Sequence, residues 1–176
     1  TLASELAEQG YDHDEIGALK ITGVLNHADL NFIGEKLTVM TALNIRDITI
    51  TGNENEKDCL AGIGGRLHSG NKGVLAHIIL PTSIKKISDQ ALKNVGLVGA
   101  IDIPDGVEYI GYAAFFENNI TGEIKLPSSL KFLGADAFSF NNGISGQLHL
   151  PDGLEIIEYE PHRGVFGDTQ LTGPLV

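Results

Sequence analysis

The sequence predicts an α/β repeat protein, a solenoid with parallel β-strands on one face, short helical or 3₁₀ turns on the other, and an α/β cap at its N-terminal end. Prolines recur at intervals of 23, 23, 24 and 23 residues, at Pro81, Pro104, Pro127, Pro151 and Pro174. A small residue stands five places before each of the first four, namely Ala76, Gly99, Gly122 and Gly146. Each of these four prolines also ends a short alternating apolar segment. A fixed period of this length is typical of stacked repeats.

Each repeat is expected to begin with a strand whose alternating apolar residues point into the core. These pairs are Ile78 and Leu80, Ile101 and Ile103, Ile124 and Leu126, and Leu148 and Leu150. Proline ends the strand because it has no N–H to give to a ladder. A second apolar pair follows each proline: Ile84 and Ile87, Val107 and Ile110, Leu130 and Leu133, and Leu154 and Ile157.

The rest of each repeat is expected to close the core from the outer side. Ala91-Leu92, Ala114-Phe115 and Ala137-Phe138 would fill it on helical or 3₁₀ turns. Asn94, Asn118 and Asn141 follow, where a side-chain amide can satisfy backbone groups of a turn. One unit has too small an apolar face to bury by itself, so the units must stack.

The fourth unit departs from this pattern. Phe166 lies fifteen residues after Pro151, whereas the corresponding residue lies eleven after its proline in the earlier units. Four residues are therefore inserted within about 158–164, and we expect them to bulge from one face as a candidate binding loop. The loop carries Glu158, Tyr159, Glu160, His162 and Arg163. Residues 171–176 begin another strand, whose open edge could pair with a second copy in a homodimer.

Residues 1–73 are expected to form an N-terminal capping region, and residues 74–176 the repeats, the last of them truncated. A helix is predicted over 2–9 behind Thr1 as its N-cap, and a strand over 18–22. A helix beginning near Asn26 and a strand over 43–51 complete a strand–helix–strand unit. The glycine-rich stretch 52–73 predicts an irregular connection.

The composition argues against several classes of partner. The net charge of −11, from 23 acidic and 12 basic residues, does not supply the clustered Lys and Arg that nucleic acids require. No window approaches the roughly 18 apolar residues of a membrane span. The single cysteine, Cys59, cannot form an internal disulfide. The chain begins at Thr1 with no signal-like segment, so we expect a trimmed start.

No motif in the sequence nominates catalytic, cofactor or metal chemistry. The run of Asp12, His13, Asp14 and Glu15 offers oxygen ligands but lacks the spacing of a calcium loop, and we expect a solvated turn there. The spacing of Gly65 and Gly70 matches the two glycines of a phosphate loop, but the Lys and the Ser or Thr that follow the second glycine in such a loop are absent. Cys59 has no nominated base, so a buried or idle thiol is expected.

The candidate binding surface consists of the residues that alternate with the core positions of the strands. These residues are His77, Ile79, Ala100, Asp102, Glu123, Lys125, Gln147 and His149. A continuous side-chain array on a rigid solenoid is well suited to a large ligand, whether protein or glycan. The alternative is a merely solvated face. No aromatic residue occurs in the array, which argues mildly against sugar stacking.

The runs Leu126 to Phe138 and Ile103 to Phe115 resemble the BspA-like bacterial leucine-rich repeats, as do Leu19 to Leu30 and Leu37 to Asp47 for the divergent N-terminal repeat. The resemblance covers about residues 18–176. It implies a leucine-rich-repeat solenoid from a secreted or surface-attached protein of a host-associated bacterium, linked to adhesion and protein binding. It carries no catalytic residues. This chain departs from the family pattern at Leu92, Ser88 and Glu158, and in the insertion.

Three functions are therefore weighed. The first is a non-enzymatic module that recognises a protein or other macromolecule through the strand face or the insertion. The second is a structural spacer or assembly unit that pairs through its open C-terminal edge. The third, an enzyme such as a hydrolase, is disfavoured because no acid–base pair is nominated.

Overall fold

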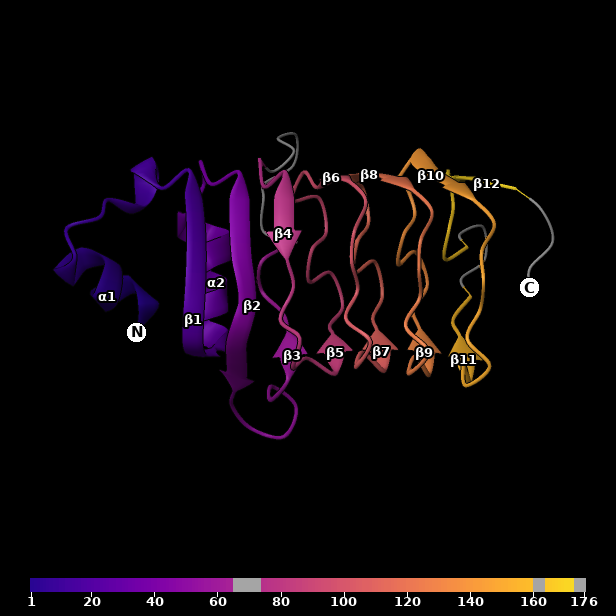
Figure 1. Cartoon of the computed structure of the whole chain (residues 1–176), viewed down its shortest axis with the longest axis horizontal. Helices are drawn as coiled ribbons and strands as arrows, with labels where there is room; N and C mark the ends of the chain where they lie inside the picture. The colour runs from indigo at the N-terminus through magenta and orange to yellow at the C-terminus, as the bar shows by residue number, and fades with distance from the viewer. Residues whose placement is uncertain (65–73, 160–163, 173–176) are drawn as a thin grey trace.

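The chain winds in successive turns along one long axis, with the first helix at one end and the last strand at the other (Figure 1). The computed structural model describes residues 1–64, 74–159 and 164–172. Within them the fold is a parallel-strand β-solenoid with few helices, as the sequence predicts at this level.

The helical elements are α1 (Leu2–Glu8), the 3₁₀ turn η1 (His13–Glu15) and α2 (His27–Lys36). The strands are β1 (Ala18–Asn26), β2 (Ala42–Thr51), β3 (Cys59–Leu60), β4 (His77–Ile79), β5 (Lys86–Ile87), β6 (Val98–Gly99), β7 (Tyr109–Ile110), β8 (Asn119–Gly122), β9 (Phe132–Leu133), β10 (Gly143–Gly146), β11 (Ile156–Ile157) and β12 (Gln170–Leu171). They form three sheets, and the strands within each sheet are parallel. In the view of Figure 1, β1-β2-β4 lies in front, β6-β8-β10-β12 above and β3-β5-β7-β9-β11 below.

The predicted elements of the N-terminal part are present. Thr1 caps α1, because its Oγ1 accepts a hydrogen bond from the Ser4 N–H at 3.2 Å. Asn26 and Asp29 form a reciprocal capping box at the start of α2, with distances of 3.0 and 3.1 Å. The first strand is longer than predicted, since β1 continues through Gly23 to Asn26. That residues 1–73 act as a cap distinct from the repeats stays a prediction.

The predicted strand before each proline forms only once, at β4. In the later units, segments 100–103, 123–126 and 147–150 form no strand, and the pairing lies just before them in the upper sheet. The small residue stands where the chain leaves the upper sheet. The strands β6, β8 and β10 end at Gly99, Gly122 and Gly146, which have φ of 79°, 83° and 91°, a conformation that glycine adopts readily.

The predicted helical or 3₁₀ turns on the outer side of the repeats are also wrong. The described outer segments are turns, and each contains non-glycine residues with positive φ, such as Ala113 at 52° and Glu117 at 57°. A right-handed helix cannot include them. Backbone N–H groups bond to the next unit instead, as when Phe115 donates to the Ala137 carbonyl at 2.8 Å.

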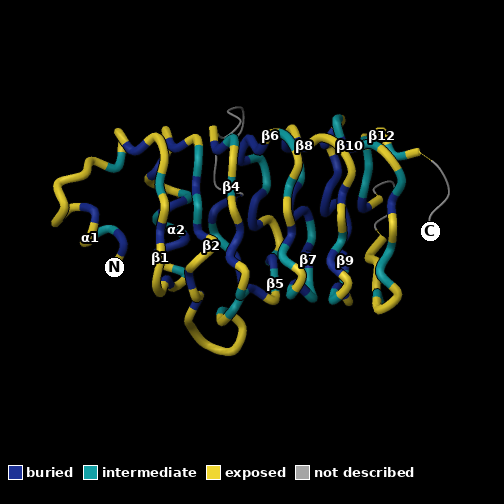
Figure 2. The backbone as a smooth tube through the Cα atoms, in the orientation of Figure 1, coloured by how far each residue is buried: buried dark blue, intermediate teal, exposed yellow. Residues whose placement is uncertain are grey.

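The core is one continuous column through the turns, and Figure 2 shows buried residues along the inside of the solenoid. Leu92, Phe115 and Phe138 are fully buried, as predicted. Phe138 stacks on Phe115 at 5.0 Å and on Phe166 at 5.3 Å between ring centroids. Phe166 therefore occupies the same column despite its shifted position in the sequence.

The last apolar pair does not join this core. The earlier pairs are buried, whereas Leu154 is partly buried and Ile157 is 47% exposed. Ile157 therefore differs from its counterparts Ile87, Ile110 and Leu133 in the earlier units. The cause is its place on β11, which has β9 on one side and no strand of the described chain on the other.

Candidate functional site: the front face

The front face is formed by the β1-β2-β4 sheet and by segments 100–103, 123–126 and 147–150, which continue it along the solenoid (Figure 1). Strand register fixes its first polar columns, by which we mean lines of side chains that run from strand to strand along the solenoid. Ala18 lies opposite Ala42, which lies opposite His77, and Lys20 lies opposite Asn44, which lies opposite Ile79. The columns of the predicted binding surface therefore extend onto β1 and β2.

Sequence reasoning missed Lys20 and Asn44. Each alternates with buried neighbours, which was a usable signal, since Leu43 and Ile45 are buried beside Asn44. Their register to β4 was not readable, however, because the intervening connection has no repeat period. A register shift between Lys20 and Thr22 further breaks the correspondence.

The predicted binding residues are mostly exposed. His77, Asp102, Glu123, Lys125 and His149 are exposed. Ile79 is also exposed, at 42%, and Gln147 is half-buried with a polar contact of its own.

The polar groups of four of these residues have no partner among the described residues. In the described part of the chain, the side chains of Asp102, Glu123, Lys125 and His149 make no hydrogen bond or ion pair. A polar group that has no internal partner is open to contact with another molecule or with water.

A small hollow interrupts the front face where the ladder stops. It has a volume of about 180 Å³ and lies between β4 and the next turn, with His77, Ile79, Val98 and Ala100 in its lining. Ile79 and Val98 are 42% and 40% exposed there. The hollow places apolar surface beside the polar columns, a combination that protein interfaces use at their centre and rim.

The insertion is described only in part. Glu160, His162 and Arg163 lie outside the described residues. Tyr159 is 75% exposed. A Glu158 carboxylate oxygen lies 3.5 Å from the backbone nitrogen of Ala135, which donates to it. After the insertion the repeat resumes, because the Phe138 N–H donates to the Val165 carbonyl at 2.9 Å.

The lower sheet carries an aromatic row that sequence reasoning did not single out. Tyr109 stacks on Phe132 at 4.4 Å between centroids, and the Lys86 ammonium lies 4.5 Å from the Tyr109 ring centroid. Both faces of Tyr109 are thus covered, by Phe132 on one side and Lys86 on the other. A ring without a free face is no platform for a sugar.

The polar groups of the lower sheet are paired with one another. Lys131 donates to Glu108 at 2.7 Å, and this contact lowers the pKa of Glu108 and raises that of Lys131. Burial, with help from the Asp89 carboxylate, raises the pKa of Tyr109 to about 12. Asp89 accepts the Tyr109 hydroxyl at 3.3 Å. These polar groups of the lower sheet therefore already have partners within the protein, in contrast to those of the front face.

The remaining reactive residues are accounted for by local structure. Asp12, His13 and Asp14 bring ligand atoms within 4.8 Å of one another. Asp12 caps η1 by accepting from the Asp14 N–H at 3.0 Å, and His13 Nδ1 lies 3.0 Å from an Asp14 oxygen. Cys59 is buried, as predicted, and burial raises the pKa of its thiol. The pair Gly65 and Gly70, whose spacing matches a phosphate loop, lies outside the described residues.

Comparison with known proteins gives one family. The family model for the BspA type leucine rich repeat region matches residues 39–170 in 6 copies, which is more than half of the chain. A search of curated proteins finds no match. No helix in the described ranges is long and apolar enough to cross a membrane.

Proposed function

Because the chain belongs to the BspA-type leucine-rich repeat family, we propose that it is a non-enzymatic binding module, secreted or attached to the cell surface, that recognises a protein or other macromolecule through its front face. The family suggests an interaction module in general terms. Adhesion, the surface location and the use of the front face go beyond that. Adhesion and the surface location rest on the family, and the arrangement of the side chains supports the use of the front face.

The observation that carries the proposal is the difference between two faces of one scaffold. On the lower sheet, Lys131 and Glu108 pair with each other, and Lys86 covers Tyr109. On the front face, the exposed side chains of Asp102, Lys125 and His149 have no such partner among the described residues. A partner that binds the front face therefore need not first break intramolecular contacts, which lowers the cost of binding.

The dimensions favour a large ligand over a small one. Six front segments at the usual interstrand spacing span roughly 24 Å, the scale of a protein interface. The hollow beside β4, at about 180 Å³, is too small for a drug-sized molecule, which occupies at least about 300 Å³. A flat row of mixed charges with one apolar depression suits a macromolecular surface.

An array of extracellular-matrix proteins and glycans tests the proposal. The tightest partner is titrated against a variant with Asp102→Ala, Lys125→Ala and His149→Ala. A matched variant changes three exposed residues away from the front face, Glu54→Ala, Lys57→Ala and Asn142→Ala. We expect the front-face variant to lose affinity about tenfold or more, and the matched variant to keep it. Equal affinity of the two variants would remove the front face from consideration.

A second candidate function is self-assembly through the C-terminal end, and one observation favours it. Ile156 and Ile157 on β11, the outer strand of the lower sheet, are 51% and 47% exposed. An outer strand with exposed apolar residues can pair with another chain. Sedimentation across a dilution series checks this candidate, which fails if the protein is a monomer at every concentration.

A further inference from the structure

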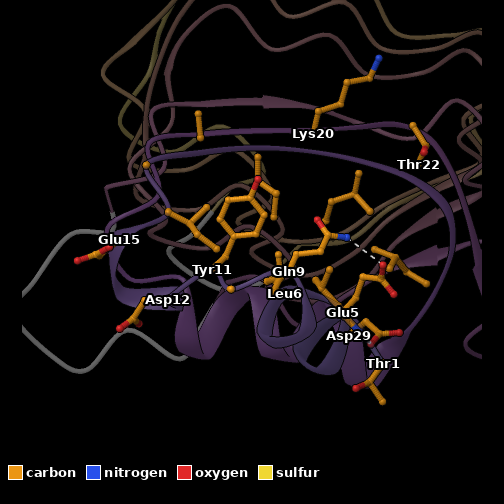
Figure 3. Close-up of a pocket in the computed structure, with 18 of the residues that line it drawn as sticks. Thr1, Glu5, Leu6, Gln9, Tyr11, Asp12, Glu15, Lys20, Thr22 and Asp29 are labelled. Carbon is orange, nitrogen blue, oxygen red and sulfur yellow. Dashed lines mark hydrogen bonds between the residues drawn. The ribbon is translucent and has the colours of Figure 1, made fainter.

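We propose that the outer edge of β1 docks an extended basic peptide segment, which adds to the front sheet as a further strand. The site is the groove between α1 and β1, which we call the N-terminal groove. It has a volume of about 1070 Å³, and Figure 3 shows Leu6, Gln9 and Tyr11 on one side of it and Lys20 and Thr22 of β1 on the other. It adjoins the polar columns assigned above to macromolecular recognition and shares Ala18 and Lys20 of β1 with them.

The first argument is the unpaired backbone of β1. This strand pairs with β2 on one side, and no strand of the described chain lies on the other. The groove is lined by almost consecutive residues from Ala18 to Leu25, as expected where a strand presents its edge to open space. An edge strand of nine residues is a template for another strand.

The direction of the backbone groups follows from two hydrogen bonds. The Gly17 carbonyl accepts from the Thr41 N–H at 2.7 Å, and the Leu25 carbonyl accepts from the Thr51 hydroxyl at 3.3 Å. Both carbonyls therefore point toward the β2 side, at either end of β1. Successive residues of a strand point their N–H and C=O groups to opposite edges, so the even-numbered residues from Ala18 to Val24 direct theirs into the groove.

The second argument is charge. Glu5, Asp12 and Glu15 line the groove and are exposed, whereas Lys20 is the single lysine or arginine among its described lining residues. Lys20 also lies 3.9 Å from the Asp47 carboxylate, outside the groove. A cationic occupant is therefore favoured and an acidic one repelled.

The third argument is the apolar surface at the mouth of the groove. Val24 and Tyr11 are 65% and 58% exposed, and both line the groove. In an added strand, main-chain hydrogen bonds supply affinity and alternate side chains meet such contacts. The occupant that fits all three features is an extended segment that alternates basic and β-branched residues.

The probe is an end-capped fluorescent peptide of sequence Lys-Val-Lys-Val-Thr-Val-Lys-Val, titrated by anisotropy. Two further peptides carry N-methyl groups on alternate amides, one set for each edge. A fourth replaces lysine with glutamate. Strand addition predicts that one N-methylated set abolishes binding while the other retains it, because only one edge of the peptide faces β1. The glutamate peptide is expected to bind about tenfold more weakly or not at all.

Two protein variants locate the binding. Thr22→Pro removes an N–H that points into the groove without removing a donor to β2, and is expected to weaken binding about tenfold. Glu5→Gln, Asp12→Asn and Glu15→Gln together should weaken it to a similar extent. The matched control, Glu54→Gln, Asp105→Asn and Asp152→Asn, neutralises exposed acids elsewhere and should bind as the wild type does. Circular dichroism confirms that each variant is folded.

Several outcomes would overturn the proposal. Absence of binding by the lysine peptide at roughly millimolar concentration is one. Equal binding by both N-methylated sets, or equal loss in the neutralised variant and its control, is another. If the wild type alone forms dimers that Thr22→Pro abolishes, the occupant is a second copy of the chain and not a basic peptide.

Discussion

The asparagine that closes each turn satisfies backbone groups of two units at once. Asn141 is fully buried, and its Nδ2 donates to the carbonyls of Phe115 and Phe138 at 2.9 Å each. Its Oδ1 accepts from the Ile120 N–H at 3.1 Å. Asn118 makes the same contacts one unit earlier. The expectation that these side chains satisfy turn backbone groups is confirmed at both positions.

Asn118 and Asn141 form a ladder of stacked asparagine side chains, and the units on either side of this ladder differ from it. Thr169 takes the place of asparagine after the insertion, and its hydroxyl donates to the Phe166 carbonyl at 2.9 Å. Among the described residues the Asn94 Oδ1 is buried without a hydrogen-bond partner. Asn94 lies one residue before the ladder position, because its N–H donates to the Phe116 carbonyl as the Glu117 N–H donates to the Ser139 carbonyl, so Val95 stands where the later units have asparagine.

Replacing Asn141 by alanine is expected to lower the free energy of unfolding by about 3 kcal/mol, because it leaves several buried backbone groups without partners. Asn142→Ala is the matched control, since Asn142 is adjacent and exposed. Urea unfolding of both variants measures the difference. A loss at Asn141 no greater than that at Asn142 would show that the ladder does not hold the units together.

Gly134 tests how closely the turns approach. A Cβ at this position would lie 2.5 Å from the Gly111 carbonyl carbon and from the Tyr112 nitrogen of the neighbouring turn. We expect Gly134→Ala to cost about 1–3 kcal/mol of unfolding free energy, because the backbone of one turn must shift. Gly17→Ala, where a Cβ meets nothing within 4 Å, should cost much less. Equal melting temperatures of the two variants would contradict this account.

At the scale of elements, the lower sheet predicts how stability depends on alkaline pH. Tyr109 ionises at an ordinary pKa of about 10 when unfolded and at about 12 in the folded protein. Between these values the unfolded state has lost a proton that the folded state keeps, so stability falls as pH rises from about 10 to about 12. Tyr109→Phe should therefore lose less stability across this window than the wild type.

The control for this prediction is Tyr159→Phe, a change at an exposed side chain. Urea unfolding at a pH of about 9 and about 11 provides the comparison. If Tyr109→Phe and Tyr159→Phe lose the same stability between the two pH values, the buried environment of Tyr109 does not protect its proton.

The elements also show where the sequence was and was not informative. Phe115 and Phe138 recur in phase, so their burial in one column was predictable. Strand positions were harder, because Gly99 and Gly122 look like ordinary small residues in the sequence. In the structure they have positive φ and end strands of the upper sheet, and the conformation of a glycine is not encoded in its spacing.

At the scale of the whole molecule, the stacked repeats were predictable from the proline period, and the family from the resemblance of the runs Leu126 to Phe138 and Ile103 to Phe115. The N-terminal groove was not predictable, because it depends on how α1 packs against α2, where the Leu2 N–H donates to the Asp29 carboxylate at 2.7 Å. That contact joins residues 27 apart with no repeat relation. The candidate residues of the front face were nameable from alternation, whereas their lack of internal partners required the structure.

The central claim is that the front face is the recognition surface, and one charge reversal tests it most directly. Lys125→Glu is compared with Lys57→Glu, a change of the same kind at an exposed lysine away from this face, by measuring affinity for the tightest ligand found on the array. The account predicts a change of about tenfold for Lys125→Glu and none for Lys57→Glu. Affinities that stay within about twofold of the wild type for both would contradict it.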